Sequence, residues 1–311
     1  MTPIIAERAR RREALCDERR PITIGRADSA GCAMLRDMAE YSHISSFHHL
    51  HVADNNGVRT LRFERNQQSS MRLDAPYETD IEYVGYLHLA LAIAPHASRV
   101  LVVGLGGGML VKQLWRDHPA MLIDAVELDP EVVAIARELF ALPADERIRV
   151  HVAHGRTFLD GCTDTYDIIV IDAFDDDHLP RPLTTEEFMR TAYARLTPGG
   201  ALAYNVIGTI SGAHSKPLRS LHRTARNVWP RVWLFPVGAI DPGGIVPENV
   251  VMLASDAEIS DETLHASIAD RVGGRVTVPG FESLGERHFR GSIRTGDVPI
   301  ITDPPGSGRR P

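Results

Sequence analysis

A glycine-rich turn directly after a short apolar run is the feature that most constrains how this chain folds. Residues 99–103 read Arg-Val-Leu-Val-Val, and Gly-Leu-Gly-Gly-Gly follows at 104–108 before the pattern of a helix begins. Such a turn brings backbone N–H groups and a helix N-terminus close to a ligand. Glycines at a strand-to-helix turn also permit tight packing, so the loop alone leaves both interpretations open.

The spacing of the glycines narrows the choice of ligand. A dinucleotide fingerprint that starts at Gly104 needs a glycine at position 109, where this chain has Met109. The glycines instead follow the pattern Gly104-x-Gly106-x-Gly108, which is the spacing of class I S-adenosylmethionine domains. We therefore expect these residues and Gly107 to bind an adenosyl compound, and the pattern disfavours a nicotinamide oxidoreductase.

A carboxylate at the end of the next predicted strand supports this interpretation. The segment 125–130 reads Ala-Val-Glu-Leu-Asp-Pro, which places Glu127 at the carboxyl end of that strand. An acid there can accept hydrogen bonds from both hydroxyls of an adenosine ribose, because the strand ends face one crevice. Asp129 and Pro130 are typical of a helix start, with Asp as the cap and Pro in the first turn.

The pattern of elements changes near Pro76. Before it, β-prone runs at 41–52, 58–63 and 69–73 and an Asn-Gly turn predict a small antiparallel β-domain over 39–76. After it, strands and helices alternate, which predicts a Rossmann-like α/β domain over 77–290 with a mostly parallel sheet. The predicted strands are 99–103, 121–126, 147–152, 166–171, 200–206, 231–236 and 248–254, and the predicted helices are 79–94, 108–117, 130–140, 155–160, 184–195, 215–228 and 259–271.

The two ends of the chain show no such pattern. We expect residues 1–38 to form a partly disordered extension and residues 291–311 to form a tail. The tail's last segment, from Asp303, has no apolar face to bury, so we expect it to be mobile. The arginine-rich stretch 8–20 is interpreted either as a solvated terminal helix or as a contact surface.

Charge and composition limit the partners. The net charge of −7 disfavours a nucleic-acid surface and is compatible with a small cationic substrate. We find neither the roughly 20 apolar residues that a membrane helix needs nor a secretory signal pattern. The three cysteines are far apart and lack the spacing of metal ligands. We therefore expect a cytoplasmic protein with no metal, nucleic-acid or membrane partner.

Further motifs resemble the spermidine synthase (polyamine aminopropyltransferase) family over roughly residues 40–255. They are Val102, the Val-Glu-Leu-Asp at 126–129, the Tyr-Asp-Ile-Ile-Val-Ile-Asp-Ala-Phe-Asp at 166–175, and the Leu-Thr-Thr-Glu-Glu-Phe at 183–188. The resemblance implies a class I S-adenosylmethionine-dependent methyltransferase-like fold with a seven-stranded sheet and a small N-terminal β-domain. It also implies a homodimer or homotetramer.

The resemblance assigns roles to individual residues. It implies that Glu127 holds the ribose and that Gln68 reaches the sulfonium or thioether ligand from the small sheet. Asp172 is implied to accept or orient the proton of the attacking amine, with Asp175 beside it binding the cationic substrate. A protonated amine has no lone pair for attack, so a transferase of this kind needs a nearby carboxylate. The plainer alternatives are a turn-capping role for Asp172 and a solvated loop around Asp175.

Three positions depart from the family pattern. Gly107 stands where the family has an aspartate that contacts the amino group of the donor. His154, in the Ala-His-Gly-Arg-Thr-Phe-Leu segment that includes Gly155, stands where the family has an aspartate that recognises adenine. A neutral imidazole can accept the same hydrogen bond in one tautomer. The family's Tyr-His-Glu-Met is replaced around Tyr83, where Tyr83, Tyr86 and His88 either line the site or pack the helix.

These residues predict a transferase that moves an aminopropyl group from decarboxylated S-adenosylmethionine to a di- or polyamine and needs no prosthetic group. The absence of an acid at Gly107 makes S-adenosylmethionine a second candidate co-substrate, because an acid there would repel its carboxylate. An S-adenosylmethionine-dependent methyltransferase or other alkyl transferase is therefore the first alternative. A non-catalytic protein that retains the nucleoside pocket is the second. Asn205, at the end of a later strand, either lines the site or caps a turn.

Overall fold

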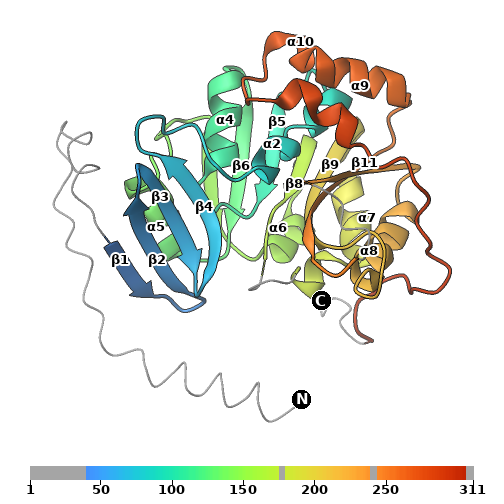
Figure 1. Cartoon of the computed structure of the whole chain (residues 1–311), viewed down its shortest axis with the longest axis horizontal. Helices are drawn as coiled ribbons and strands as arrows, with labels where there is room; N and C mark the ends of the chain where they lie inside the picture. Colours follow the sequence, from blue (N-terminus) through green and yellow to red (C-terminus); the bar gives the residue numbers. More distant parts are fainter. Residues whose placement is uncertain (1–39, 175–178, 239–243, 306–311) are drawn as a thin grey trace.

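The computed structural model describes residues 40–174, 179–238 and 244–305, and it contains two sheets (Figure 1). The predicted extension 1–38 lies outside these residues. The small sheet is antiparallel in the order β1-β2-β3-β4. The large sheet has the order β10-β11-β9-β8-β5-β6-β7. No helix among the described residues is long and apolar enough to span a membrane.

The small sheet follows from local turn chemistry. Its strands are β1 (Glu40–Ile44), β2 (His49–Asn55), β3 (Val58–Phe63) and β4 (Asn66–Arg72). Asn56 and Gly57 both have positive φ, as the two-residue turn between β2 and β3 requires. The predicted run 41–52 is two strands, because the Ser45 hydroxyl accepts the N–H groups of Phe47 and His48 and closes a turn between them.

The large sheet is mostly parallel, as predicted. Its strands are β5 (Arg99–Val103), β6 (Leu122–Glu127), β7 (Ile148–Val152), β8 (Tyr166–Ile171), β9 (Leu196–Gly208), β10 (Arg231–Pro236) and β11 (Glu248–Ser255). β11 pairs antiparallel with β9 and β10, while the other pairs are parallel. The chain places β6 and β7 on one side of β5 and then β8 and β9 on the other. Such a reversal opens a crevice at the carboxyl ends of the strands.

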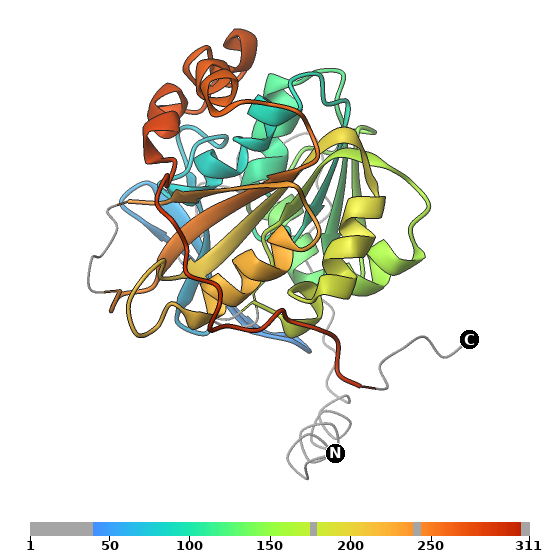
Figure 2. The same cartoon turned by 90° about the vertical axis from the view of Figure 1, so that its right-hand side faces the viewer.

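Helices cover both faces of the large sheet (Figure 2). They are α2 (Tyr83–Leu87), α3 (Ala90–Ile93), α4 (Met109–Asp117), α5 (Pro130–Glu138), α6 (Gly155–Gly161), α7 (Glu186–Ala194), α8 (Lys216–Arg226), α9 (Asp261–Ala269) and α10 (Arg271–Gly274), with 3-10 turns η2 (Arg181–Leu183) and η3 (Phe281–Arg287). Alternate strand residues enter two cores, as Val102 and Val103 do on β5. The small sheet contributes Leu61 and Phe63 to the first core.

Two predicted segments differ in the structure. The single helix predicted over 79–94 is two short helices, α2 and α3, because His88 and Leu89 donate to carbonyls three residues back and tighten the chain between them. The mobility expected from Asp303 onward is wrong for Asp303 itself, which pairs with Arg156 at 3.0 Å. The backbone N–H of Ile301 also donates to Thr224, so partners from two helices hold this segment. Residues 306–311 lie outside the described ranges.

Two buried cations dock the small sheet and its linker onto the large domain. Arg59 on β3 is fully buried, forms a two-point ion pair with Asp54, and donates to the carbonyl of Leu139 at 2.8 Å. Lys112 on α4 donates to the carbonyls of Pro76 and Phe140, each at 2.7 Å. Burial lowers the pKa of Lys112 to about 7. Both cations therefore bind carbonyls that directly follow α5.

We predict that Arg59→Ala lowers the free energy of unfolding by about 3 to 5 kcal/mol, because it leaves the Asp54 carboxylate and the Leu139 carbonyl without this partner. Urea denaturation measures the change. The matched control is Arg72→Ala on β4, whose pair with Asp74 is exposed and should contribute little. Equal effects of the two substitutions would contradict a docking role for Arg59.

Candidate active site

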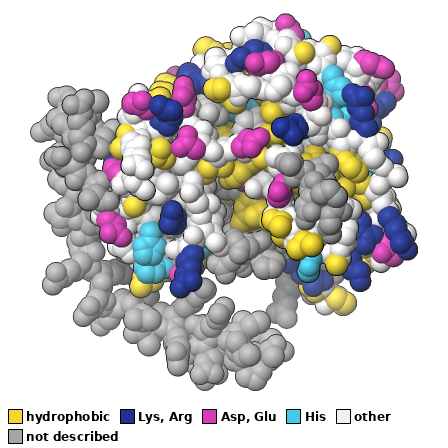
Figure 3. Space-filling view, in the orientation of Figure 1, with side chains coloured by type: hydrophobic (Ala, Val, Ile, Leu, Met, Phe, Trp, Pro, Cys, Tyr) yellow, Lys and Arg dark blue, Asp and Glu magenta, His cyan; other side chains and the backbone are white. Residues whose placement is uncertain are grey.

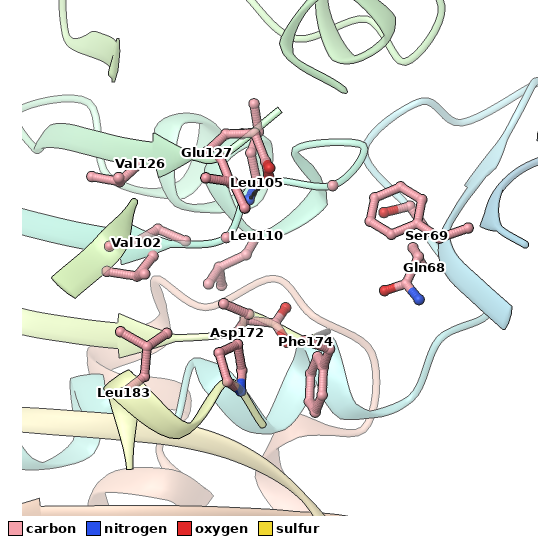
Figure 4. Close-up of a pocket in the computed structure, with 18 of the residues that line it drawn as sticks. Gln68, Ser69, Val102, Leu105, Leu110, Val126, Glu127, Asp172, Phe174 and Leu183 are labelled. Carbon is pink, nitrogen blue, oxygen red and sulfur yellow. Dashed lines mark hydrogen bonds between the residues drawn. The ribbon is translucent and has the colours of Figure 1, made fainter. Parts of the chain in front are cut away.

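A pocket of about 550 Å³ lies between the two sheets at the carboxyl ends of β5, β6 and β8. Gln68 and Ser69 enter it from the small sheet, while Glu127 and Asp172 enter from the large one (Figure 4). Apolar side chains gather around the hollow between the two sheets (Figure 3). The crevice predicted from strand order thus has the small sheet as its second wall.

The glycine loop forms part of the pocket wall on the side of the large sheet. Its glycines are needed because neighbouring atoms leave no room for side chains. Gly104 has a φ of 96°, and a Cβ there would lie 2.0 Å from the carbonyl oxygen of Asp172. Gly106 also has positive φ and faces the Ser69 hydroxyl. Gly104 and Gly106 line the pocket, whereas Gly107 and Gly108 lie behind it among apolar side chains. The loop can therefore approach both a ligand and the β8 terminus.

Glu127 ties the loop to the end of β6. Its two carboxylate oxygens accept the backbone N–H groups of Leu105 and Asp129, each at 3.0 Å. Burial raises the pKa of Glu127, and the backbone hydrogen bonds oppose that rise. The side chain is only 8% exposed, yet it lines the pocket. As predicted, Asp129 caps α5 through the N–H of Glu131, and Pro130 is the first residue of that helix.

Asp172 occupies the opposite side of the pocket, directly after β8. Its Oδ1 accepts a hydrogen bond from Nδ2 of Asn205 at 2.8 Å. A second hydrogen bond comes from the Tyr83 hydroxyl. Burial raises the pKa of Asp172 to about 6, although both hydrogen bonds lower it. A carboxyl group with this pKa is ionised at neutral pH and can still accept a proton readily.

The aromatic residues before the loop separate into two groups. Tyr83 lines the pocket, and burial together with the Asp172 carboxylate raises its pKa well above the ordinary value. Its hydroxyl therefore remains a hydrogen-bond donor. Tyr86 and His88 are each 1% exposed and pack inside the domain, with His88 bonded to Gln113. The packing interpretation is correct for these two residues.

His154 lines the pocket as the N-cap of α6. Its Nδ1 accepts the backbone N–H of Arg156 at 3.1 Å, and burial together with Arg156 lowers its pKa. The neutral ring therefore carries its proton on Nε2, which makes Nε2 a donor. Of the two tautomers considered from the sequence, this is the one that cannot accept a hydrogen bond from an adenine amino group through Nε2. Gly155 is needed beside it, because a Cβ would lie 2.3 Å from Val103.

Some contributors were not evident from the sequence. Asn205 neither lines the pocket nor simply caps a turn, because it hydrogen-bonds the Asp172 carboxylate. Phe140 is buried against Gly107, and Ser69 accepts the Gly107 N–H at 2.7 Å. Of these three residues, only Asn205 could be identified as a candidate from the sequence, because it is a polar residue at the end of a predicted strand. The sequence patterns around Phe140 and Ser69 give no indication that either residue contacts the glycine loop.

Two further expectations concern Asp175 and a bound metal. Asp175 lies outside the described residues, so its predicted substrate contact stays a prediction. Within the described ranges, no three His, Cys, Asp or Glu side chains are arranged to hold a metal ion. The charged residues of the described lining are the two carboxylates of Glu127 and Asp172 and the guanidinium of Arg181.

The chain is similar to proteins of one family. A probable polyamine aminopropyl transferase of Bifidobacterium longum is 31% identical over 57% of this chain and 41% of its own length. A polyamine aminopropyltransferase of Vibrio vulnificus is 28% identical over 63% of this chain and 64% of its own length. The chain thus spans less than two thirds of each of these relatives.

A solved structure supports the fold. The crystal structure of a probable spermidine synthase from Corynebacterium glutamicum matches 88% of this chain and 99% of its own, with a TM-score of 0.68 and 21% identity. At this identity the likeness shows the fold, and the predicted methyltransferase-like architecture is confirmed. Residues 82–232 match the spermine/spermidine synthase domain. This matched segment contains the glycine loop, Glu127 and Asp172, and it is similar to that family's domain.

Proposed function

We propose that this protein moves an aminopropyl group from decarboxylated S-adenosylmethionine to a di- or polyamine and releases methylthioadenosine. The observation that carries the proposal is the Asp172 carboxylate, which has a pKa of about 6 and shares one pocket with the glycine loop and Glu127. The names of the curated relatives support the same activity.

The proposed reaction uses Asp172 as the proton acceptor. The nitrogen lone pair of the amine attacks the carbon next to the sulfonium, a C–N bond forms, and the C–S bond breaks. The bonding electrons return to sulfur, which leaves as a neutral thioether, while the amine proton passes to Asp172. No prosthetic group is required, because the sulfonium is itself the electrophile. The rate gain comes largely from alignment of nitrogen, carbon and sulfur.

The remaining lining residues are proposed to hold the nucleoside and its substituents. Glu127 would accept hydrogen bonds from the ribose, while Gly104 and Gly106 would lie against the adenosyl group. Gln68 and Tyr83 would contact the reacting chain between the two sheets, since both line the pocket and Tyr83 interacts with Asp172. His154 would donate from Nε2 to an adenine ring nitrogen, because its Nδ1 is already occupied.

One observation favours the alternative donor, S-adenosylmethionine. A Cβ at Gly107 would lie 2.6 Å from Cδ1 of Phe140, so this position has no room for a side chain as Phe140 is placed. A family member with an acid here could bind the donor's amine and repel a carboxylate. Without that acid, methyl or other alkyl transfer from S-adenosylmethionine is the second candidate function. A non-catalytic nucleoside-binding role is the third.

We predict that incubation with decarboxylated S-adenosylmethionine, S-adenosylmethionine and putrescine yields an aminopropylated amine together with methylthioadenosine. Mass spectrometry of the products identifies the group transferred. A methylated product without methylthioadenosine would overturn aminopropyl transfer and select the alternative. Binding without any product would favour the non-catalytic role.

We predict that methylthioadenosine raises the melting temperature of the protein and that Glu127→Gln reduces this rise. The substitution replaces a charged acceptor by an amide, which should weaken binding by roughly 10- to 100-fold. Each variant is compared with its own ligand-free melting curve, because ligand stabilisation follows mass action. Glu131→Gln, on the first turn of α5 and outside the pocket lining, is the control. An undiminished shift in Glu127→Gln would remove the ribose assignment.

We predict that Asp172→Asn lowers kcat/KM by roughly 10²- to 10⁴-fold, because an amide cannot accept the amine proton. In the unsubstituted protein kcat/KM should fall as the pH drops below about 6, where Asp172 becomes protonated. Asp167→Asn, at the other end of β8, is the matched control and should retain most activity. Turnover by Asp172→Asn at the original rate, with ligand still bound, would rule out this role.

The remaining expectations are part of the proposal. A small cationic amine fits the two carboxylates of the described lining, Glu127 and Asp172. The division into a β-domain (39–76), a catalytic domain (77–290) and a tail (291–311) stays a prediction. So do the homodimer or homotetramer and the cytoplasmic location.

A further inference from the structure

A chain of three polar side chains extends from the pocket wall into the large sheet. Asp172 follows β8, Asn205 belongs to β9, and Asn249 belongs to β11. Nδ2 of Asn205 donates to Oδ1 of Asp172 at 2.8 Å, and Nδ2 of Asn249 donates to Oδ1 of Asn205 at 2.9 Å. Asn205 is fully buried, and neither asparagine lines the pocket. The two amides therefore form a layer behind Asp172.

Strand register brings these three residues together. Ile171 pairs with Tyr204 in the parallel ladder, so the next residues along the two chains, Asp172 and Asn205, are neighbours. On the antiparallel side Asn205 pairs with Val251, and Asn249 is two residues away on the same face of β11. The contact thus depends on the backbone of the sheet and not on a surface loop.

The hydrogen bond from Asn249 selects one of two orientations of the Asn205 amide. An amide has a donating end and an accepting end, and a half-turn about its last bond exchanges them. In the orientation observed, Nδ2 faces the Asp172 carboxylate. In the other, Oδ1 would face the carboxylate and repel it. Donation from Asn249 to Oδ1 is compatible only with the first orientation.

We propose that Asn249 is a positioning residue that fixes the amide of Asn205 and thereby holds the Asp172 carboxylate oriented toward the pocket and ready to accept a proton. The inference deepens the proposed transferase function and rests on it for the identity of the proton donor. Asn249 itself touches neither the pocket nor Asp172. Its effect is transmitted entirely through Asn205.

Other groups act on the same carboxylate and are unchanged by a substitution at Asn249. Tyr83 donates to Asp172 from α2, and the backbone N–H of Asp172 donates to β5. The described titratable residues of the pocket also include Glu127, His154, His48 and Arg181, and Glu248 precedes Asn249 on β11. A shift caused by Asn249 must therefore be measured as a difference between variants that retain all of these groups.

The experiment compares Asn249→Ala and Asn249→Asp with the unsubstituted protein. Asn249→Ala removes the donor. Asn249→Asp keeps the size and shape of the side chain but replaces the donor by an acceptor, so Asn205 is drawn into the other orientation. The matched control is Ser255→Ala, which removes the bond from Ser255 to the carbonyl of Gly200 at the far end of the same strand pair.

The primary measurement is the titration of the Asp172 carboxyl carbon by NMR, with its signal assigned as the one absent from Asp172→Asn. We expect the midpoint to rise by roughly 0.5 to 1 pH unit in Asn249→Ala, because a hydrogen bond that stabilises the charged form is weakened. It should rise by more in Asn249→Asp, where the added negative charge contributes as well. The acid limb of kcat/KM should move to higher pH by the same amount, with a severalfold loss of kcat near neutrality and little change in KM for the donor.

Two outcomes would overturn the proposal. One is an unchanged Asp172 titration in both variants at position 249. The other is an equal shift in Ser255→Ala, which would assign the effect to general loosening of the sheet. If Asn249→Ala does not fold, the neutral and similarly sized Asn249→Leu takes its place, because the charge of Asn249→Asp would by itself raise the Asp172 midpoint. Because the titration needs no turnover, a protein that transfers no aminopropyl group would refute the proposed function while the NMR result still decides the role of Asn249.

Discussion

The pocket depends on the docking of the small sheet through two buried cations. Arg59 and Lys112 approach from different elements and bind the adjacent carbonyls of Leu139 and Phe140, where the chain leaves α5. Carbonyls at a helix C-terminus lack partners within the helix and carry partial negative charge. Arg59, whose charge is paired with Asp54, and Lys112 therefore both donate hydrogen bonds to them. The same contact fixes Phe140 beside the glycine loop.

A second constraint is the close approach of three backbone segments at the carboxyl end of β5. Gly104 lies against the carbonyl of Asp172, and Gly155 lies against Val103. Side chains at either glycine would separate β5 from β8 or from α6. These glycines therefore do more than leave room for a ligand. They allow Glu127 at the end of β6 and Asp172 after β8 to share one pocket.

The parts of the fold and site that depend on local pattern could be predicted from sequence. Strand 99–103, the Asp129 cap and Glu127 at a strand end follow from periodicity and turn chemistry over a few residues. The contacts of Phe140 with Gly107 and of Asn249 with Asn205 could not be predicted from the sequence, because they join residues that are distant in it. The tautomer of His154 also depends on tertiary structure, since it follows from the cap geometry of α6.

The difference between local patterns and long-range contacts matters for the choice of donor substrate. Glu127 and the glycine loop, which we propose to bind the nucleoside, follow from local strand and turn patterns. The space around Gly107, by contrast, is filled by Phe140, which follows α5, and by Ser69 on β4 of the small sheet. An aspartate introduced at position 107 would meet the Phe140 ring before it reached a ligand. Under the proposed function, a change of donor through position 107 would therefore require a substitution at Phe140 as well.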